Sequence, residues 1–267
     1  MANLTYMKSL CLSLFGFLFC FNMLAQQRDQ SSYKLIAHRG GVVDERTPEN
    51  SLPALNRAIE EGYWMVEIDL RMSRDGVLFV HHDNNFNRFF NIDKKVAELE
   101  WSEISRLTSA VGTKILTFEE VLRNSRGKIR LMIDNKIPGN DTALFSKVLR
   151  LMEQYDQLKE AYMIGREEST DYFTGKIKLS CTRQQIEENK KKPGYKAKHY
   201  YLFSDNIKQG DVRWAEKEGI PVVGVINAWS MSDQGKVMEM AASKAEKLKT
   251  AGVRIYQIDS IFKELLK

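Results

Sequence analysis

The chain has 267 residues, with 40 Lys and Arg against 35 Asp and Glu and a formal net charge of +5. The basic residues are spread along the chain apart from Lys190-Lys191-Lys192, a run typical of a solvated loop, so the sequence offers no footprint for nucleic-acid binding. The length suits one large domain and is typical of a β/α barrel, which takes about 250 residues.

The first 25 residues have the pattern of a secretory signal peptide. Lys8 precedes a nearly uncharged apolar segment at residues 10–24, and a polar stretch follows Ala25. The apolar segment is short for a membrane-spanning helix. We therefore expect cleavage after Ala25, export to the periplasm or the extracellular space, and a single domain over residues 26–267.

The cysteines bear on the same expectation. A lipid-anchored form at Cys20 is disfavoured because the bulky Phe19 precedes it, where small residues are needed. Cleavage after residue 25 would leave Cys181 as the one cysteine of the mature chain. No internal disulfide could then form, and the core alone would hold the fold.

From residue 33 onward, short apolar runs alternate with stretches of helical period. This rhythm predicts parallel strands joined by right-handed helical crossovers, the α/β class, and a (β/α)8 TIM barrel. Strands are expected at residues 35–39, 65–70, 78–82, 129–135, 162–165, 177–180, 200–204, 222–226 and 254–258, and helices at 51–61, 102–107, 117–124, 142–157, 211–218 and 236–251. Since a barrel uses eight strands, we expect either 177–180 or 200–204 to lie outside it.

Capping residues agree with several of these helices. Ser51, or Asn50 before it, can cap the first helix, and Thr117 with Glu120 forms a capping box. Glycines that end helical stretches follow three of them, at Gly62, Gly219 and Gly252.

Two acids lie two residues apart within the apolar run 66–70. Because side chains alternate along a strand, Glu67 and Asp69 point to the same face. Two adjacent carboxylates repel each other unless a cation, most commonly a divalent metal, lies between them. The alternative is an edge strand whose two acids face water.

The ends of the neighbouring strands favour the metal. Working residues of a parallel barrel lie at the carboxyl ends of its strands. The first strand ends in His38-Arg39, the third in His82, and the fourth carries Asp134 and Lys136 on one face. By alternation His81 points the other way, and we expect it to form a structural hydrogen bond.

This set of residues suggests its own chemistry. Asp134 would join Glu67 and Asp69 in an oxygen-rich site for one divalent cation, Mg²⁺ or Ca²⁺, whereas zinc is disfavoured because the set lacks cysteine. Two further cationic side chains and two histidines beside such a site suit an anionic substrate, and a phosphodiester fits well.

The chain resembles the glycerophosphodiester phosphodiesterases over roughly residues 36–90. The segments that carry the resemblance are His38-Arg39-Gly40, Pro48-Glu49-Asn50-Ser51, Glu67-Ile68-Asp69-Leu70, Ser73-Arg74-Asp75-Gly76 and His82-Asp83, with Arg88 following. The looser later matches are residues 116–122 and Ile133-Asp134-Asn135-Lys136.

The resemblance implies a metal-dependent phosphodiesterase on a β/α barrel, and the expected signal peptide would make it a secreted one. It would hydrolyse glycerophosphodiesters or related small-molecule phosphodiesters to an alcohol and a phosphomonoester such as glycerol 3-phosphate. The implied site residues are the catalytic pair His38 as base and His82 as acid, the metal ligands Glu67, Asp69 and Asp134, and the phosphate-binding residues Arg39 and Lys136.

The chain also departs from the family. Asp134 stands where the family has Glu, and the segments 226–229 and 253–259 differ from the family's last strands. Two alternatives follow: a sphingomyelinase D-like lyase that releases a cyclic phosphate, and an anion-binding barrel without turnover. Four aromatic residues either form a lipid-contacting rim or pack internally: Phe86, Phe89, Phe90 and Trp229.

Overall fold

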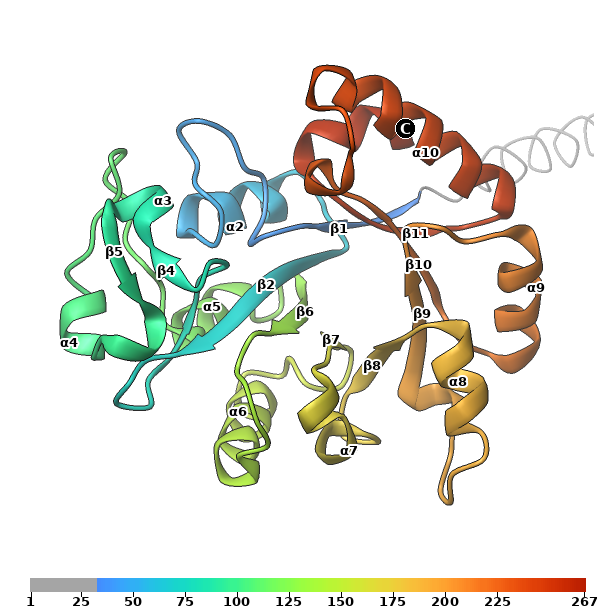
Figure 1. Ribbon diagram of the computed structural model, residues 1–267, viewed down its shortest axis with the longest axis horizontal. Coiled ribbons are helices and arrows are strands. Elements are labelled where there is room, and N and C mark those ends of the chain that lie inside the picture. Colours follow the sequence, from blue (N-terminus) through green and yellow to red (C-terminus); the bar gives the residue numbers. More distant parts are fainter. Residues whose placement is uncertain (1–32) are drawn as a thin grey trace, which may run out of the picture. The chain divides into compact units, whose positions relative to one another are not determined.

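Eight parallel strands close into a barrel, as the alternating pattern predicts (Figure 1). Strand β1 hydrogen-bonds to both β2 and β11, which closes the ring. In order around the barrel the strands are β1 (Lys34–Ala37), β11 (Ile255–Ile258), β10 (Val222–Ile226), β9 (Tyr200–Ser204), β8 (Lys178–Cys181), β7 (Tyr162–Ile164), β6 (Arg130–Asn135) and β2 (Met65–Met72).

The computed structural model describes residues 33–267, and Lys34–Lys267 form one compact unit. The signal peptide predicted at residues 1–25 lies outside the described residues. None of the helices in the described range is both long and apolar enough to cross a membrane.

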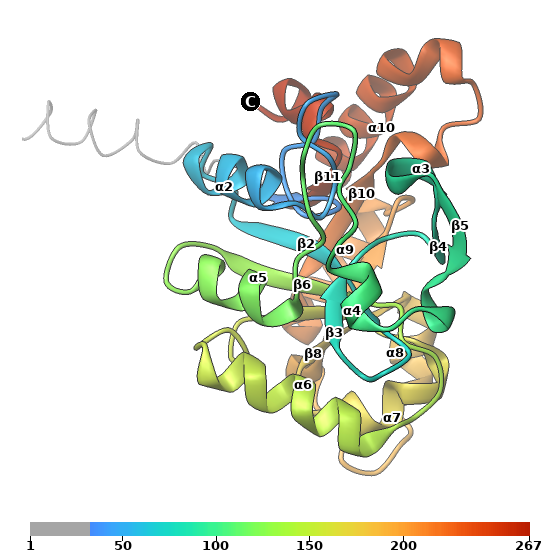
Figure 2. The ribbon, with the colours of Figure 1, turned by 90° about the vertical axis from the view of Figure 1, so that its left-hand side faces the viewer.

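Helices cover the outside of the barrel, and Figure 2 shows α2, α5 and α6 following one another along it. The longer helices are α2 (Leu52–Glu60), α5 (Phe118–Ser125), α6 (Thr142–Gln154), α8 (Arg183–Asn189), α9 (Gln209–Glu218) and α10 (Val237–Ala251), with one turn at α7 (Thr170–Phe173). The predicted caps are present: Ser51 accepts from the Ala54 N–H, and Thr117 and Glu120 cap each other.

Helix α8 was not expected from the sequence. Thr182 and Gln185 form a capping box at its start, but Ile186 is its one buried residue. A helix with a single buried side chain has almost no apolar period, so the pattern that predicts helices is missing here.

The strand outside the barrel is β3 (Leu78–Val80), and the expectation that residues 177–180 or 200–204 would lie outside was wrong. Both of those segments are barrel strands, whereas β3 pairs antiparallel with the far end of β2. Only residues 73–77 connect β2 to β3, and a parallel crossover needs a dozen residues or more. The short connection forces a hairpin.

The hairpin continues into a small lobe beside the barrel. It contains β4 (Asn85–Phe86), α3 (Asn87–Phe90), β5 (Ile92–Lys95) and α4 (Trp101–Ile104). Phe79, Phe86 and Ile104 are fully buried in its core. Phe86 is therefore a core residue and not part of an aromatic rim, and Phe90 packs against the same cluster, whereas Trp229 is 67% exposed.

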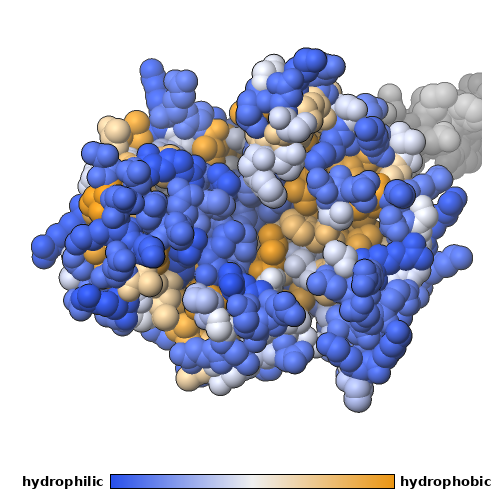
Figure 3. Space-filling view, viewed as in Figure 1, coloured by the Kyte–Doolittle hydropathy of each residue, from blue (hydrophilic) through white to orange (hydrophobic). Residues whose placement is uncertain are grey.

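The barrel interior is divided between apolar and charged side chains along its axis. Met65, Met132 and Tyr201 belong to an apolar cluster of barrel strands. Further along the same strands, Asp69 of β2 pairs in register with Asp134 of β6. The outer surface is largely hydrophilic in Figure 3, with hydrophobic residues visible towards the centre of the view. The acidic groups Glu67, Asp69 and Asp134 thus lie beyond this apolar layer, towards the carboxyl ends of the strands.

The loop after β1 packs tightly on α2. Gly41 has φ +140°, and a Cβ atom at this position would lie 2.0 Å from the Ala54 carbonyl oxygen. The neighbouring Val42 N–H donates to that same oxygen at 3.1 Å. Only glycine fits at this position, which holds the end of β1 against the start of α2.

We predict that Gly41→Ala lowers the free energy of unfolding by about 3 kcal/mol or more, because backbone must move to relieve the clash. The matched control is Gly139→Ala, where φ is also positive (+75°) but no atom lies within 4 Å of the added Cβ. It should cost only about 1 kcal/mol. Urea unfolding of both variants measures the difference, and equal losses would contradict the argument.

Candidate functional site

His38 follows β1 and is held by a carboxylate from the other end of the chain. Its backbone N–H donates to the Ile258 carbonyl at 3.0 Å, and its Nδ1 lies 2.6 Å from Asp259 Oδ1. Burial alone would raise the pKa of Asp259, but the hydrogen bond and charge of His38, the hydrogen bond from the Ala228 N–H and the charge of Arg39 together hold this pKa below its ordinary value. Asp259 is therefore ionised and accepts a hydrogen bond from the His38 Nδ1–H, which leaves Nε2 of His38 without a proton and able to accept one.

Glu67, Asp69 and Asp134 form a compact acidic cluster. Oxygen atoms of the three carboxylates lie within 4.8 Å of one another. Glu67 and Asp69 are each 1% exposed. The Arg39 N–H donates to Glu67 Oε2 at 2.7 Å, and the Asn50 amide donates to Asp69 Oδ2 at 2.8 Å. These bonds hold the carboxylates in place without neutralising their charge.

Such a cluster is unstable without a cation. Burial, followed by the charges of Asp69 and Asp134, raises the pKa of Glu67 well above its ordinary value. Burial also raises the pKa of Asp134. Lys136 Nζ lies 2.5 Å from Asp134 Oδ2 and 3.4 Å from Asp69 Oδ1. One ammonium group beside three carboxylates leaves an excess of negative charge, and an oxygen-rich cluster of this kind could hold a divalent cation.

The backbone between the first strand and the first helix is strained where it meets the cluster. Arg39 and Asn50 both have left-handed φ, at +51° and +52°. The Asn50 N–H donates to the Arg39 carbonyl at 2.8 Å, and the Gly40 N–H donates to the Glu67 carbonyl at 2.6 Å. Backbone strain of this kind is kept where a site needs it.

The Arg39 guanidinium links this loop to the hairpin. Its Nη1 donates to Glu49 Oε2 at 3.1 Å, and its Nη2 lies 3.1 Å from His82 Nε2. His82 Nδ1 lies 2.8 Å from Asp83 Oδ1. Since arginine can only donate, the His82 Nε2 accepts here, and the ring is neutral with its proton on Nδ1.

The hairpin explains how His82 reaches the barrel mouth. Strand β2 extends past the rim, and β3 returns along it, so that the His81 N–H donates to the Asp69 carbonyl at 3.0 Å. Arg71 donates to the carbonyl oxygens of His81 and His82 and holds this return. His81 itself is buried, with Nε2 2.7 Å from the Asn85 carbonyl, as expected for a structural residue.

The seven residues predicted for the site all lie at the carboxyl ends of the first strands. They are His38, Arg39, Glu67, Asp69, His82, Asp134 and Lys136. Direct contacts join several of them: His38 Nε2 lies 3.9 Å from Glu67 Oε2, and Arg39 contacts both Glu67 and His82. The shorter Asp134 side chain still reaches the cluster.

Several members of the site were not predicted from the sequence. Asp259 orients His38, Asp83 orients His82, and Arg88 binds both Asp83 and Glu49. Asp83 directly follows His82, and Asp259 directly follows the last strand. Their positions in the sequence could therefore have indicated that both lie at the site. Glu49, His82 and Asp83 are also close enough to hold a metal, but Arg39 and Arg88 already form ion pairs with the two acids.

The chain is thus a (β/α)8-barrel protein with a buried cluster of three acids at the carboxyl ends of its strands. Residues 38–192, more than half of the chain, match the glycerophosphoryl diester phosphodiesterase family. The chain belongs to this family.

Individual relatives are more distant. The chain is 28% identical to YhdW of Bacillus subtilis over 128 residues, which cover 45% of this chain and 52% of that protein. It is 34% identical over 94 residues to the glycerophosphodiester phosphodiesterase of Caldanaerobacter subterraneus, covering 33% and 38%. The chain therefore spans about half or less of the curated relatives' length in these matches.

Solved structures support the fold. A glycerophosphoryl diester phosphodiesterase from Parabacteroides distasonis superposes with a TM-score of 0.70 at 20% identity, covering 90% of this chain and 89% of that one. At this identity the likeness shows the fold alone.

We predict that Glu67→Gln stabilises the metal-free protein at neutral pH. Folding raises the pKa of Glu67, so the folded state holds this proton more tightly than the unfolded chain. Its contribution to stability is complete below the ordinary glutamate pKa of 4.5 and is lost as the pH rises through the folded-state pKa. Glutamine stays uncharged throughout.

Thermal unfolding in a chelator across the pH range measures this effect. The Tm of Glu67→Gln should rise above that of the unmodified chain as the pH increases from acid to neutral. Glu216→Gln on the exposed side of α9 should change the Tm equally little at every pH. A Glu67→Gln curve parallel to the unmodified one would refute the prediction.

Proposed function

We propose that this protein is a metal-dependent phosphodiesterase that cleaves glycerophosphodiesters to an alcohol and a phosphomonoester such as glycerol 3-phosphate. One observation carries the proposal. Two histidines, each with Nδ1 on a carboxylate, flank the same acidic cluster: His38 Nε2 is 3.9 Å from Glu67, and His82 Nε2 contacts the arginine bound to Glu67. Family membership supports the same reaction class.

Glu67, Asp69 and Asp134 would hold one Mg²⁺ or Ca²⁺ ion. Bound there, the ion would neutralise phosphoryl oxygens and polarise the phosphorus. Arg39 and Lys136 would add positive charge at the phosphate. Lys136 contacts Asp134 of the cluster, and the Arg39 guanidinium contacts His82, so both cations are near the groups proposed to act on the phosphate.

His38 would act as the general base. The Asp259 carboxylate fixes the ring and its tautomer, so Nε2 can accept the proton of the attacking hydroxyl, either from the substrate itself or from water. The oxygen that loses this proton forms the new bond to phosphorus. Where that oxygen belongs to the substrate, the first product is a cyclic phosphate, which water then opens to the phosphomonoester. The charge on the His38 ring is then balanced by Asp259.

His82 would act as the general acid. In the substrate-free arrangement Arg39 donates to its Nε2, which therefore lacks a proton. A phosphate group competes for Arg39, and once Arg39 turns towards it, Nε2 is free to become protonated. As the bond between phosphorus and the leaving oxygen breaks, this proton passes to the leaving alkoxide.

In the described part of the chain, few exposed aromatic side chains are available for contact with lipid. Trp229 is 67% exposed, in the turn after β10, whereas Phe86 is fully buried. Peripheral contact with a lipid surface would thus use Trp229 and not a broad aromatic rim.

Hydrolysis of glycerophosphodiesters and lysophospholipids tests the function. His38→Ala and His82→Ala should each lower kcat by roughly 10²- to 10⁴-fold. Asp259→Asn keeps the His38 ring but no longer fixes it, so a smaller loss of roughly 10- to 100-fold is expected. A chelator should abolish turnover until Mg²⁺ or Ca²⁺ is returned. Glu216→Gln serves as the control.

The other outcomes of this assay decide between the alternatives. A stable cyclic phosphate released from lysophospholipid would identify a sphingomyelinase D-like lyase. Substrate binding without any product would identify a binding barrel. Full activity of His38→Ala or His82→Ala would refute the catalytic roles, and activity unaffected by a chelator would refute the metal requirement.

We also propose that the protein is exported after cleavage of an N-terminal signal peptide. The charged start, the apolar segment 10–24 and the polar residues after Ala25 support this. Mass spectrometry of the protein from its native host should find Gln26 at the mature N-terminus and the protein outside the cytoplasm. An intact Met1 on cytoplasmic protein would contradict the proposal.

A further inference from the structure

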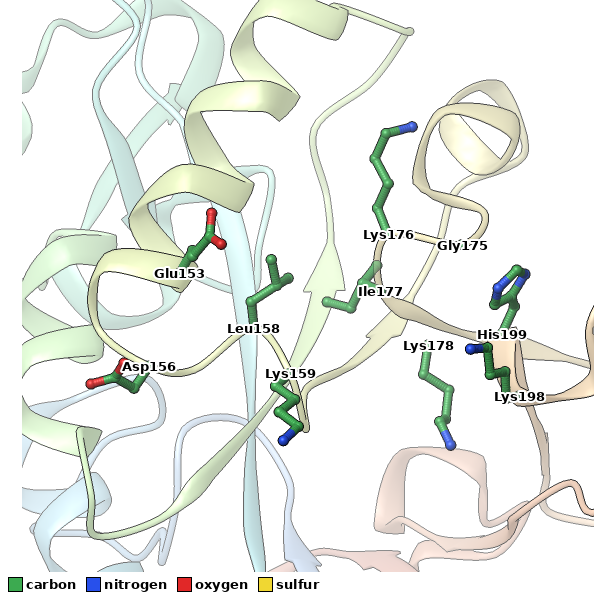
Figure 4. Close-up of a pocket in the computed structure, with 10 residues that line it drawn as sticks. All are labelled: Glu153, Asp156, Leu158, Lys159, Gly175, Lys176, Ile177, Lys178, Lys198 and His199. Atoms are coloured by element: carbon green, nitrogen blue, oxygen red, sulfur yellow. The ribbon is translucent and has the colours of Figure 1, made fainter.

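A cavity of about 540 Å³ lies at the end of the barrel opposite the acidic cluster. It is bounded by the end of α6 and the residues after it, by the start of β8, and by the turn before β9 (Figure 4). The acidic cluster lies towards the carboxyl ends of the strands, whereas Lys178 opens β8 and His199 precedes β9. This cavity is therefore separate from the proposed active site.

Basic side chains dominate the cavity wall. Lys159, Lys178, Lys198 and His199 line it, together with Lys176. In Figure 4, Lys159 lies on one side of the space, and Lys178, Lys198 and His199 lie on the other. Lys176 extends away from Lys159 and Lys178, and its Nζ donates to the Tyr172 carbonyl.

The acids of the wall do not neutralise these lysines. Asp156 Oδ2 already accepts two hydrogen bonds from Arg126, at 3.0 and 2.6 Å. In Figure 4 the carboxylates of Glu153 and Asp156 both point away from Lys159 and Lys178. Between residues 33 and 267, no carboxylate lies within the 4.0 Å ion-pair distance of Lys159, Lys178 or Lys198.

Other lysines of the chain differ in this respect. Lys190, Lys244 and Lys263 each contact a carboxylate oxygen at 2.7, 2.9 and 3.0 Å. The cavity lysines are thus unpaired in a chain that pairs several of its lysines. Bringing unpaired ammonium groups together costs free energy that a bound anion would recover.

Two wall residues are only partly solvated. Lys178 is half-buried, and its Nζ lies 5.5 Å from the centre of the Tyr162 ring. Burial lowers the pKa of Lys178. His199 Nδ1 is buried and has no hydrogen-bond partner within the described part of the chain. A buried polar atom without a partner indicates a missing ligand or solvent group.

We propose that Lys159, Lys178, Lys198 and His199 form a second anion site, which binds a phosphomonoester group, either free or as the headgroup of a lipid. Three ammonium groups and an imidazole match a dianion with several oxygen acceptors better than a single carboxylate. The cavity is large enough to hold an organic group beyond the phosphate itself. This site does not depend on the activity proposed for the opposite end of the barrel.

The four histidines allow each end of the barrel to be observed separately. His199 reports on the cavity, His38 and His82 report on the barrel mouth, and His81 reports on the buried lobe. Ring ¹H–¹³C NMR spectra of the full mature chain should be recorded while glycerol 3-phosphate is added at constant pH, up to about 10 mM, which nearly saturates a site with a Kd of about 1 mM.

We expect the His199 signal to shift with a saturable dependence on glycerol 3-phosphate. The double variant Lys159→Gln and Lys178→Gln should weaken this binding by about tenfold or more. The control Lys217→Gln removes an exposed charge from α9, outside the cavity, and should change the affinity less than about twofold. Unchanged thermal unfolding of the double variant verifies that the fold is kept.

Vesicles separate the two sources of the ligand. A His199 shift or co-sedimentation with phosphatidic acid vesicles, but not with phosphatidylcholine vesicles, assigns the headgroup, and a shift with glycerol 3-phosphate assigns the free ester. The site is supported if binding of either ligand is seen in the unmodified chain and is lost in the double variant. A His199 signal that stays in place with both ligands, or that moves equally in the double variant, overturns it. Shifts of the His38 and His82 signals without a His199 shift would show binding at the barrel mouth only and would likewise overturn the cavity site.

Discussion

The structure depends on one unfavourable arrangement, the burial of Glu67 and Asp69 beside Asp134. Their oxygens lie within 4.8 Å of one another, and both acids of β2 are almost fully buried. Such a cluster persists only if cations and hydrogen-bond donors surround it. Lys136, the Arg39 backbone and the Asn50 amide partly meet this requirement, and the remaining negative charge is what suits the cluster to a divalent ion.

The parts of the fold around the cluster serve this requirement. The strained turn at Arg39 aims its N–H at Glu67, and Gly41 lets that turn pack on α2. The extension of β2 past the barrel rim, with β3 returning beside it, brings His82 back to the mouth. Two histidines thereby face one cluster from different connections of the barrel, which is the basis of the proposed acid and base roles.

The two ends of the barrel have opposite charge. The carboxyl ends of the strands gather three acids, whereas the other end gathers unpaired lysines around a cavity. The sequence carries no pattern that links these lysines, since Lys159 precedes β7, Lys178 opens β8 and Lys198 precedes β9. Only the closing of the barrel places them around one space.

The sequence by itself determined the barrel class and the main site residues, because both depend on local patterns. Alternation aligned Glu67 with Asp69 on one face, and Ser51 and Thr117 marked helix starts through short-range hydrogen bonds. The five-residue connection before β3 also required a hairpin. This was overlooked because nine segments looked like strands and the wrong one was assigned outside the barrel. Tertiary structure alone decided the partner of His38, since Asp259 is 221 positions away and reaches it only when β11 pairs with β1. Contacts of that range depend on the closing of the barrel, which no local pattern records.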